Sequence, residues 1–337
     1  YLFTKLMYIK KKVYKIKKRF WNKLSILCYH RIEDYDADPV NITVSTKNFL
    51  KHVEWLKKST NIISPKDFED VLINRKDFPK RSVMLTFDDG YSSYFDTMKY
   101  LNRESIKALF FISTPSKTFF WDTLKNILII PSIIKDDHYK LLCETFKILK
   151  IKINIEKSLD VKSIKIIKKW KISNSNYPFE RCRAFSILAN ILEQENSYLE
   201  NSLYSELKPL SSNAPNLKNI FKNSKITNYH SIGCHTSNHF NLSMLSQHQQ
   251  KIEIEQNKKK LEMILNKNID YFAYPYGTRE HYNKESISLI KKRFKLAFSN
   301  FTGKIHKDSN HFELPRFLVR DWDIQNFKVK IENIFES

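Results

Sequence analysis

Two adjacent carboxylates and a pair of histidines follow short apolar segments in this 337-residue chain. Asp88 and Asp89 stand after one such segment, and His235 and His239 stand after another. One carboxylate and two neutral imidazoles form a complete three-ligand set for Zn²⁺ or another divalent transition metal, with one coordination position left for water. Such an ion lowers the pKa of its water to about 7 and polarises a carbonyl group, which is the chemistry of hydrolysis.

Other interpretations of these residues have to be weighed. The same ligand set occurs in non-haem iron oxygenases, which usually have an antiparallel β fold. The two histidines are also compatible with a hydrogen-bonded pair at a strand end that binds nothing, but the nearby Asp88–Asp89 pair favours a metal site. If the segment from His235 to His239 is helical, the spacing of four residues puts both imidazoles on one face.

The elements that must position these residues alternate along the chain. Short apolar segments predict strands at 24–31, 61–64, 83–87, 107–112, 232–234, 271–274, 296–298 and 317–319. Segments of helical spacing predict helices at 48–58, 66–74, 94–102, 247–266 and 285–292. This alternation predicts an α/β fold with parallel strands, which argues against the oxygenase interpretation. Functional groups of such folds gather at the carboxyl ends of the strands, where we expect Asp88, Asp89, His235 and His239.

The alternation is interrupted in the middle of the chain. Between 118 and 225 the sequence predicts helices at 121–130, 139–149, 161–170 and 178–207, with no metal-ligand spacing. We therefore expect an α/β unit made of residues 25–117 and 226–325, with a helical insertion at 118–225 that caps the active site. A separately folded domain is the alternative for this insertion.

Three ordered motifs resemble those of a known family. Thr86-Phe87-Asp88-Asp89-Gly90 and His235-Thr236-Ser237-Asn238-His239 resemble the first two motifs of the polysaccharide deacetylases, the NodB-homology group of carbohydrate esterase family 4. Phe272-Ala273-Tyr274-Pro275-Tyr276-Gly277 resembles the third. The resemblance implies a distorted (β/α)7 TIM-like barrel. It further implies that Asp89, His235 and His239 bind the metal, that Asp88 is the general base, and that the backbone N–H at Tyr276 stabilises the oxyanion.

The sequence departs from the family pattern in two places. Many family members have an arginine in the third motif that orients the catalytic aspartate, and this arginine is missing here. Arg316 could supply the same charge from the last predicted strand. The alternative is that Arg316 is a surface or ion-pair residue without this role. The late motif that carries the catalytic acid is also not evident. Among His30, His306 and His311, His30 is preferred because it follows the first predicted strand, although a rim histidine without a catalytic role remains an alternative.

The charge of the chain is strongly positive, with a net value of +22. Residues 1–24 are basic and free of acidic residues, and they are compatible with either an amphipathic helix on an anionic membrane surface or a frayed arm. Nucleic acid is not expected as a partner because no recognition motif accompanies the charge. No signal peptide or membrane-spanning segment is visible, and a cytoplasmic or membrane-peripheral location is favoured. The four cysteines, none in a Cys-x-x-Cys pair, favour a reducing compartment.

These observations predict a metal-dependent hydrolase. Its expected substrate is an N- or O-acetylated carbohydrate, with N-acetylhexosamine units of a cell-surface polysaccharide or its precursor as the favoured case. Two other classes stay open: a catalytically silent carbohydrate-binding barrel, and a basic protein that associates with membranes or nucleic acid through its charge.

Overall fold

The computed structural model describes residues 24–115, 118–194 and 217–336. Almost all of the basic arm at 1–24, with its predicted membrane contact, and the end of the last helix predicted in the insertion lie outside these residues. None of the helices within the described ranges is long and apolar enough to cross a lipid bilayer.

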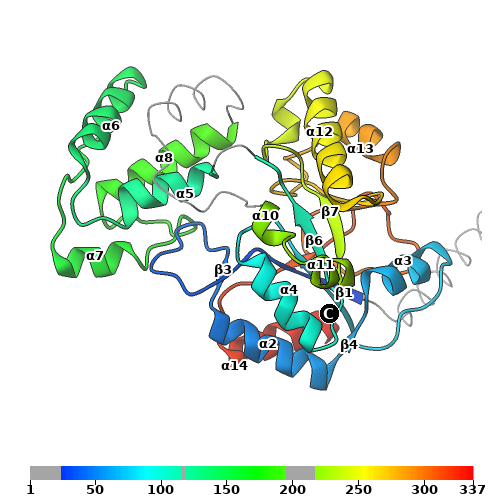
Figure 1. Ribbon diagram of the computed structural model, residues 1–337. Helices are drawn as coiled ribbons and strands as arrows, with labels where there is room; N and C mark the ends of the chain where they lie inside the picture. Colours follow the sequence, from blue (N-terminus) through cyan, green and yellow to red (C-terminus); the bar gives the residue numbers. More distant parts are fainter. Residues whose placement is uncertain (1–23, 116–117, 195–216, 337) are drawn as a thin grey trace, which may run out of the picture.

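A curled parallel sheet forms the centre of the molecule (Figure 1). Its neighbouring strands follow the order β10 (Phe317–Leu318), β1 (Leu24–Tyr29), β5 (Ser82–Phe87), β6 (Leu109–Ile112), β7 (Ser231–Cys234), β8 (Tyr271–Ala273) and β9 (Leu296–Phe298), and β4 (Asn61–Ile62) pairs with β5. A single parallel bridge between Phe298 and Leu314 connects β9 to the segment that leads into β10. The predicted NodB-type (β/α)7 fold is confirmed.

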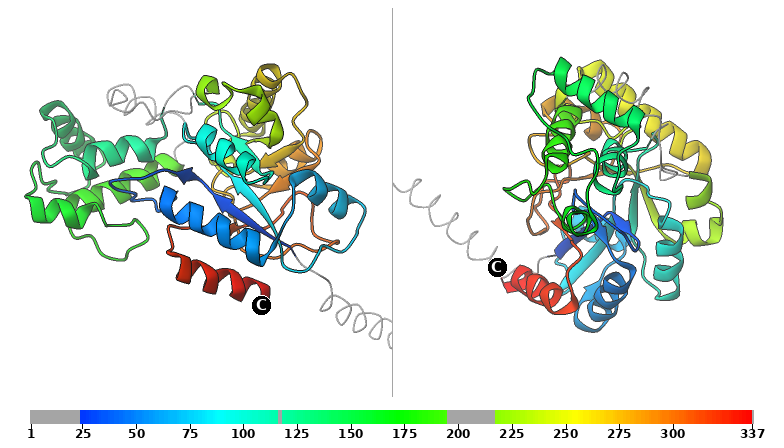
Figure 2. Two further views of the ribbon diagram at one scale, coloured as in Figure 1. Left: turned by 60° about the horizontal axis from the view of Figure 1, so that its bottom comes forward. Right: turned by 90° about the vertical axis from the view of Figure 1, so that its left-hand side faces the viewer.

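Helices cover the outer face of the sheet (Figure 2). They are α2 (Thr46–Ser59), α3 (Pro65–Ile73), α4 (Tyr94–Arg103), α12 (Gln247–Leu265), α13 (Lys284–Lys291) and α14 (Ile324–Glu336). The sequence analysis missed α14, although its buried Phe327 and Ile331 have helical spacing. A small parallel pair, β2 (Arg31–Ile32) with β3 (Thr43–Val44), was also missed.

Alternation along each strand separates two apolar clusters. Ile26, Met84 and Phe111 belong to the cluster enclosed by the curled sheet, whereas their strand neighbours belong to the cluster beneath the helices. Gly233 lies opposite Phe111 in the β6–β7 pair, and a Cβ atom at this glycine would lie 2.5 Å from the Phe111 ring. The glycine therefore allows a large aromatic side chain to fill the barrel below the strand ends.

Helices also make up the described part of the segment between β6 and β7. They are α5 (Phe120–Leu124), the π-helical turn η1 (Lys125–Ile129), α6 (Asp136–Ile148), α7 (Val161–Ile167), α8 (Glu180–Gln194), α10 (Leu217–Ile220) and α11 (Ser224–Tyr229). The elements from α5 to α8 lie beside one end of the barrel in Figure 1. A second short helix, η2 (Leu242–Met244), follows β7.

Two buried histidines are neutral because burial disfavours their charged form. His230 donates from Nε2 to the Met98 carbonyl at 3.0 Å and accepts the Ala108 N–H at Nδ1. His52 donates from Nε2 to the Trp322 carbonyl at 2.8 Å. Burial lowers the pKa of each histidine to about 4.

The unfolded chain binds protons at these two histidines near the usual pKa of about 6.5, so stability must fall as the pH drops from there toward 4. Between pH 7.5 and 5, each histidine should remove roughly 2 kcal/mol of the free energy of unfolding. We expect His230→Gln to lose roughly 2 kcal/mol less than the wild type over this range, as measured by urea denaturation at both pH values. Equal losses in the two proteins would contradict the assignment.

Candidate active site

The structure brings the residues singled out in the sequence to one end of the barrel. Asp88 and Asp89 follow β5, His235 and His239 follow β7, and Tyr276 lies beyond β8. His30 interrupts the extended chain between β1 and β2, and Arg316 directly precedes β10. The two other histidines considered as the acid, His306 and His311, do not line the pocket described below.

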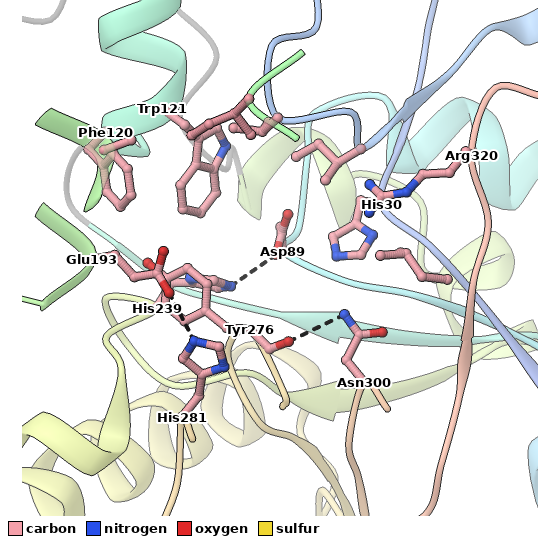
Figure 3. A pocket seen from close by; sticks show the side chains of 15 residues that line it. His30, Asp89, Phe120, Trp121, Glu193, His239, Tyr276, His281, Asn300 and Arg320 are labelled. Carbon is pink, nitrogen blue, oxygen red and sulfur yellow. Dashed lines mark hydrogen bonds and ion pairs between the residues drawn. The ribbon is translucent and has the colours of Figure 1, made fainter. Parts of the chain in front are cut away.

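The predicted metal ligands form a compact, buried group. Asp89 Oδ1 lies 3.5 Å from His235 Nε2 and 3.3 Å from His239 Nε2. One ligand atom from each of the three residues lies within 4.8 Å of the others, and all three residues are buried. Figure 3 shows the contact between Asp89 and His239 inside the pocket.

The bonding of these residues fits a cation. His235 Nδ1 donates to the Ala273 carbonyl at 2.8 Å, which leaves the lone pair of Nε2 facing Asp89. Asp89 Oδ1 is buried without a hydrogen-bond partner among the described residues. Two acceptor atoms that face each other in a buried site repel unless a cation lies between them, so the donor set suits Zn²⁺ or a similar divalent ion.

The conditional expectation that His235 and His239 share a helical face is wrong. The segment is a loop in which Thr236 and His239 have φ angles of 62° and 60°. The His239 N–H donates to Thr236 Oγ1 at 3.0 Å, and the Glu253 carboxylate accepts the backbone N–H of Asn238 at 2.8 Å. The side-chain acceptors therefore bend the chain back, and the turn rather than a helix brings the two imidazoles together.

Asp88 and Asp89 point in different directions because the backbone turns sharply between them. The Asp88 N–H still pairs with the Tyr29 carbonyl at 3.0 Å, whereas Asp89 has a φ angle of 85°. A non-glycine residue in this conformation is strained and is typical of functional sites. One carboxylate thus faces the histidines while its neighbour faces Arg316.

Arg316 holds Asp88 through two parallel hydrogen bonds. Its two terminal nitrogens donate to Asp88 Oδ1 and Oδ2, each at 2.6 Å, and Nε donates to the Ser299 carbonyl at 2.7 Å. The guanidinium is fully buried, so Arg316 is an ion-pair partner of Asp88 and not a surface residue. Burial opposes ionisation of Asp88, but Arg316 and His235 hold the pKa of its carboxyl below the usual value.

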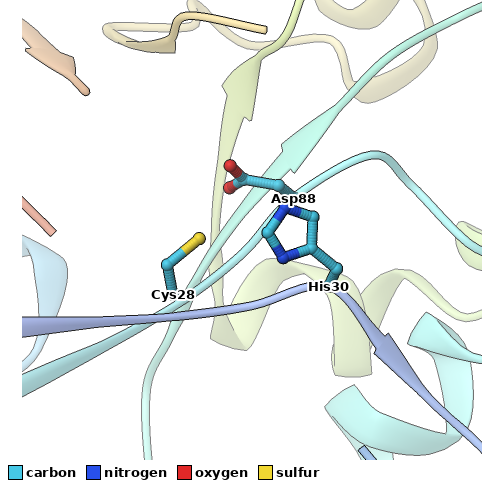
Figure 4. A group of neighbouring side chains, drawn as sticks. All are labelled: Cys28, His30 and Asp88. Carbon is cyan, nitrogen blue, oxygen red and sulfur yellow. The ribbon is translucent and has the colours of Figure 1, made fainter. Parts of the chain in front are cut away.

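His30 lies against both carboxylates. Its Nδ1 is buried without a hydrogen-bond partner among the described residues. Burial lowers the pKa of His30, although Asp89 and Asp88 act in the opposite direction. Figure 4 shows His30 next to Asp88 and Cys28, a group with ligand atoms within 4.8 Å of one another. This group suits a cation poorly, because Arg316 already occupies both oxygens of Asp88 with a positive charge.

A pocket of about 290 Å³ opens onto these residues. Its lining includes six polar or aromatic side chains that the sequence analysis did not single out: Phe120, Trp121, Glu193, His281, Asn300 and Arg320. Figure 3 shows Phe120 and Trp121 on one wall, with His30 and Arg320 at the other end. Tyr276, with a φ angle of 58°, has its ring 6.4 Å from that of Trp121 and 4.8 Å from that of His239.

A buried ion pair fixes the aromatic wall. Asp122 accepts hydrogen bonds from Arg31 at 2.6 and 2.5 Å, and the exposed fractions of the two side chains are 1% and 2%. The adjacent Trp121 donates from its indole nitrogen to Tyr91 at 3.0 Å and stacks on Phe119 at 4.6 Å. The ion pair and the indole hydrogen bond thus fix the segment after β6 against the barrel at the place where this segment lines the pocket.

Comparisons with known proteins give the relatives of this chain. A family model described as polysaccharide deacetylase matches residues 75–129 and 209–293. The putative polysaccharide deacetylase YxkH of Bacillus subtilis (strain 168) is 33% identical over 92 residues, which cover 27% of this chain. The match spans only 32% of the length of YxkH.

Two solved structures resemble most of the chain. The Streptococcus pyogenes deacetylase PplD, in complex with acetate, matches with a TM-score of 0.55 and 17% identity, covering 92% of this chain and 99% of that one. IcaB from Ammonifex degensii matches with a TM-score of 0.54 and 16% identity, covering 92% and 96%. At these identities the likeness shows the fold.

The fold and the site together define a parallel α/β barrel with a two-histidine, one-carboxylate group beside an arginine-bound aspartate. The ordered motifs lie within the residues that the family model matches. The chain resembles the polysaccharide deacetylases, the NodB-type carbohydrate esterases, over the residues that this family model matches.

Proposed function

We propose that this protein is a metal-dependent deacetylase that hydrolyses the acetamide of an N-acetylhexosamine unit. The observation that carries the proposal is the buried group of Asp89, His235 and His239 beside a second carboxylate held by Arg316. The family match and a similarly folded deacetylase in complex with acetate support the same reaction. O-deacetylation would use the same groups and is the alternative.

Asp89, His235 and His239 would hold the metal. A bound Zn²⁺ or similar ion would lower the pKa of a water molecule to about 7 and polarise the acetyl carbonyl. Asp88 would accept the proton of the attacking water, since an ionised carboxylate keeps free lone pairs when arginine binds both oxygens.

The remaining steps fall to residues on the pocket wall. The backbone N–H of Tyr276 would stabilise the tetrahedral oxyanion that forms when the water oxygen bonds to the acetyl carbon. His30 would then give a proton to the departing amine as the carbon–nitrogen bond breaks, leaving acetate and a free amino sugar. The aromatic wall at Trp121 suits a sugar ring, and the cavity of about 290 Å³ suits a single hexosamine unit.

Metal analysis combined with acetate release tests the proposal. Purified protein should contain about one equivalent of a divalent transition metal and release acetate from short N-acetylglucosamine oligomers. A chelator should abolish the release, and adding Zn²⁺ should restore it. Metal-free protein that binds the oligomers without releasing acetate would instead indicate a silent carbohydrate-binding barrel.

Removing one ligand should remove the ion. We expect His239→Ala to lose most of its metal and at least a thousandfold in acetate release, because two ligands bind the ion much more weakly than three. The matched control is His281→Ala, which alters a histidine of the same pocket that is bonded to Glu193 and Thr278 rather than to Asp89. This control should keep its metal. Full metal content in His239→Ala would contradict the ligand assignment.

A further inference from the structure

One cation on the pocket wall forms no ion pair with a carboxylate of the described residues. Arg320 lines the pocket near His30, beside the apolar side chains of Val40, Ile42 and Leu318. Its guanidinium donates to the backbone carbonyl of Asn41. No carboxylate oxygen of the described residues lies within 4.0 Å of its nitrogens.

The nearest carboxylates are engaged elsewhere. Asp321, the next residue, accepts hydrogen bonds from Ser45 N at 3.0 Å, Ser45 Oγ at 2.8 Å, Asn48 Nδ2 at 2.7 Å and Tyr35 Oη at 2.9 Å. Asp38 accepts the Thr43 N–H at 2.8 Å and faces Lys171 at 3.9 Å. Neither carboxylate forms an ion pair with Arg320 within 4.0 Å, and burial lowers the pKa of Arg320 although Asp38 acts in the opposite direction.

The carboxylates of the pocket itself are also committed. Asp89 faces the two histidines, and Glu193 lies 2.9 Å from His281 Nε2. In Figure 3 this Glu193–His281 pair and Arg320 lie at different ends of the pocket. Both carboxylates that line the pocket therefore have a partner, whereas no carboxylate of the described residues forms an ion pair with the Arg320 guanidinium.

A guanidinium among apolar side chains, without an ion-pair partner, lowers the stability of the protein unless a ligand supplies that partner. We propose that the acetylated sugar bound here carries an anionic group, a phosphate or a carboxylate, that pairs with Arg320. This inference rests on the proposed function and adds the substrate class. Arginine suits the role because its planar fork donates two parallel hydrogen bonds to either group.

The experiment compares neutral and anionic probes of similar size. Acetate release is measured from the methyl glycoside of N-acetylglucosamine, N-acetylglucosamine 1-phosphate, N-acetylglucosamine 6-phosphate and N-acetylmuramic acid. The wild type should favour at least one anionic probe by about tenfold to a hundredfold in kcat/KM, the value of one charge-assisted pair. The preferred probe then distinguishes a phosphate from a carboxylate.

Variants assign the preference to Arg320. We expect Arg320→Met to lose the preference and Arg320→Lys to keep part of it, with thermal melting and metal content showing that each variant is folded. The matched control is Arg279→Met, an exposed arginine that stacks on Phe301 outside the pocket lining and should leave the preference unchanged.

Three results would overturn the inference. In the first, the wild type does not prefer any anionic probe. In the second, Arg320→Met prefers the anionic probe as strongly as the wild type does. In the third, Arg320→Met changes only the inhibition by added acetate, which would mean that Arg320 binds the acetate product. If no probe releases acetate and the protein binds no metal, the proposed function itself fails, and this outcome is distinct from the other three.

Discussion

Asp88→Asn should keep its metal and lose about a thousandfold in kcat for acetate release, which is within the usual contribution of general base catalysis. The asparagine side chain has nearly the same size, but its amide cannot take a proton from water. The metal should remain because Asp88 Oδ2 lies 3.9 Å from His235 Nε2, whereas Asp89 approaches both histidines more closely.

The control for this variant is Asp89→Asn. The two substitutions change adjacent residues in the same way, so a difference between them reports the separate roles of the side chains. We expect Asp89→Asn to lose metal and Asp88→Asn to retain it, as measured by metal analysis of the folded proteins. An Asp88→Asn protein that is as active as the wild type would show that another group accepts the proton.

The sequence allowed the barrel and the convergence of the site to be predicted because both depend on local patterns. Short apolar strands ending in Asp88–Asp89 or in His235 have a fixed direction in a parallel sheet, so their ends meet without any knowledge of contacts. The role of Arg316 was left open, because its burial depends on the approach of the chain before β10 to the end of β5. Only coordinates show such a contact.

The residues of the pocket wall could not be predicted from the sequence, for a related reason. Trp121 and Glu193 lie in helices between β6 and β7, where helical spacing predicts the element but not the face that meets the barrel. The Arg31–Asp122 pair that ties α5 to the barrel joins residues 91 positions apart. The loop from His235 to His239 differs from the helical expectation because Thr236 and Glu253 supply acceptors for its backbone.

Arg316→Met should destabilise the protein and impair catalysis at the same time. Methionine fills much of the volume but leaves the buried Asp88 carboxylate without its partner, and breaking one side of a buried pair costs about 3–5 kcal/mol. The free energy of unfolding in urea should fall by that amount. Acetate release should fall by about a hundredfold, because Asp88 is no longer held in one orientation.

A double-mutant cycle with Asp88→Asn separates pairing from packing. If the two residues stabilise the fold as a pair, Asp88→Asn/Arg316→Met should lose less free energy of unfolding than the sum of the single variants, because no buried charge is left unpaired. Arg316→Lys should recover part of the activity and less of the stability, since a single ammonium cannot bond both carboxylate oxygens in parallel. Additive losses would mean that Arg316 acts mainly through its contact with the Ser299 carbonyl, and the orienting role would then have to be abandoned.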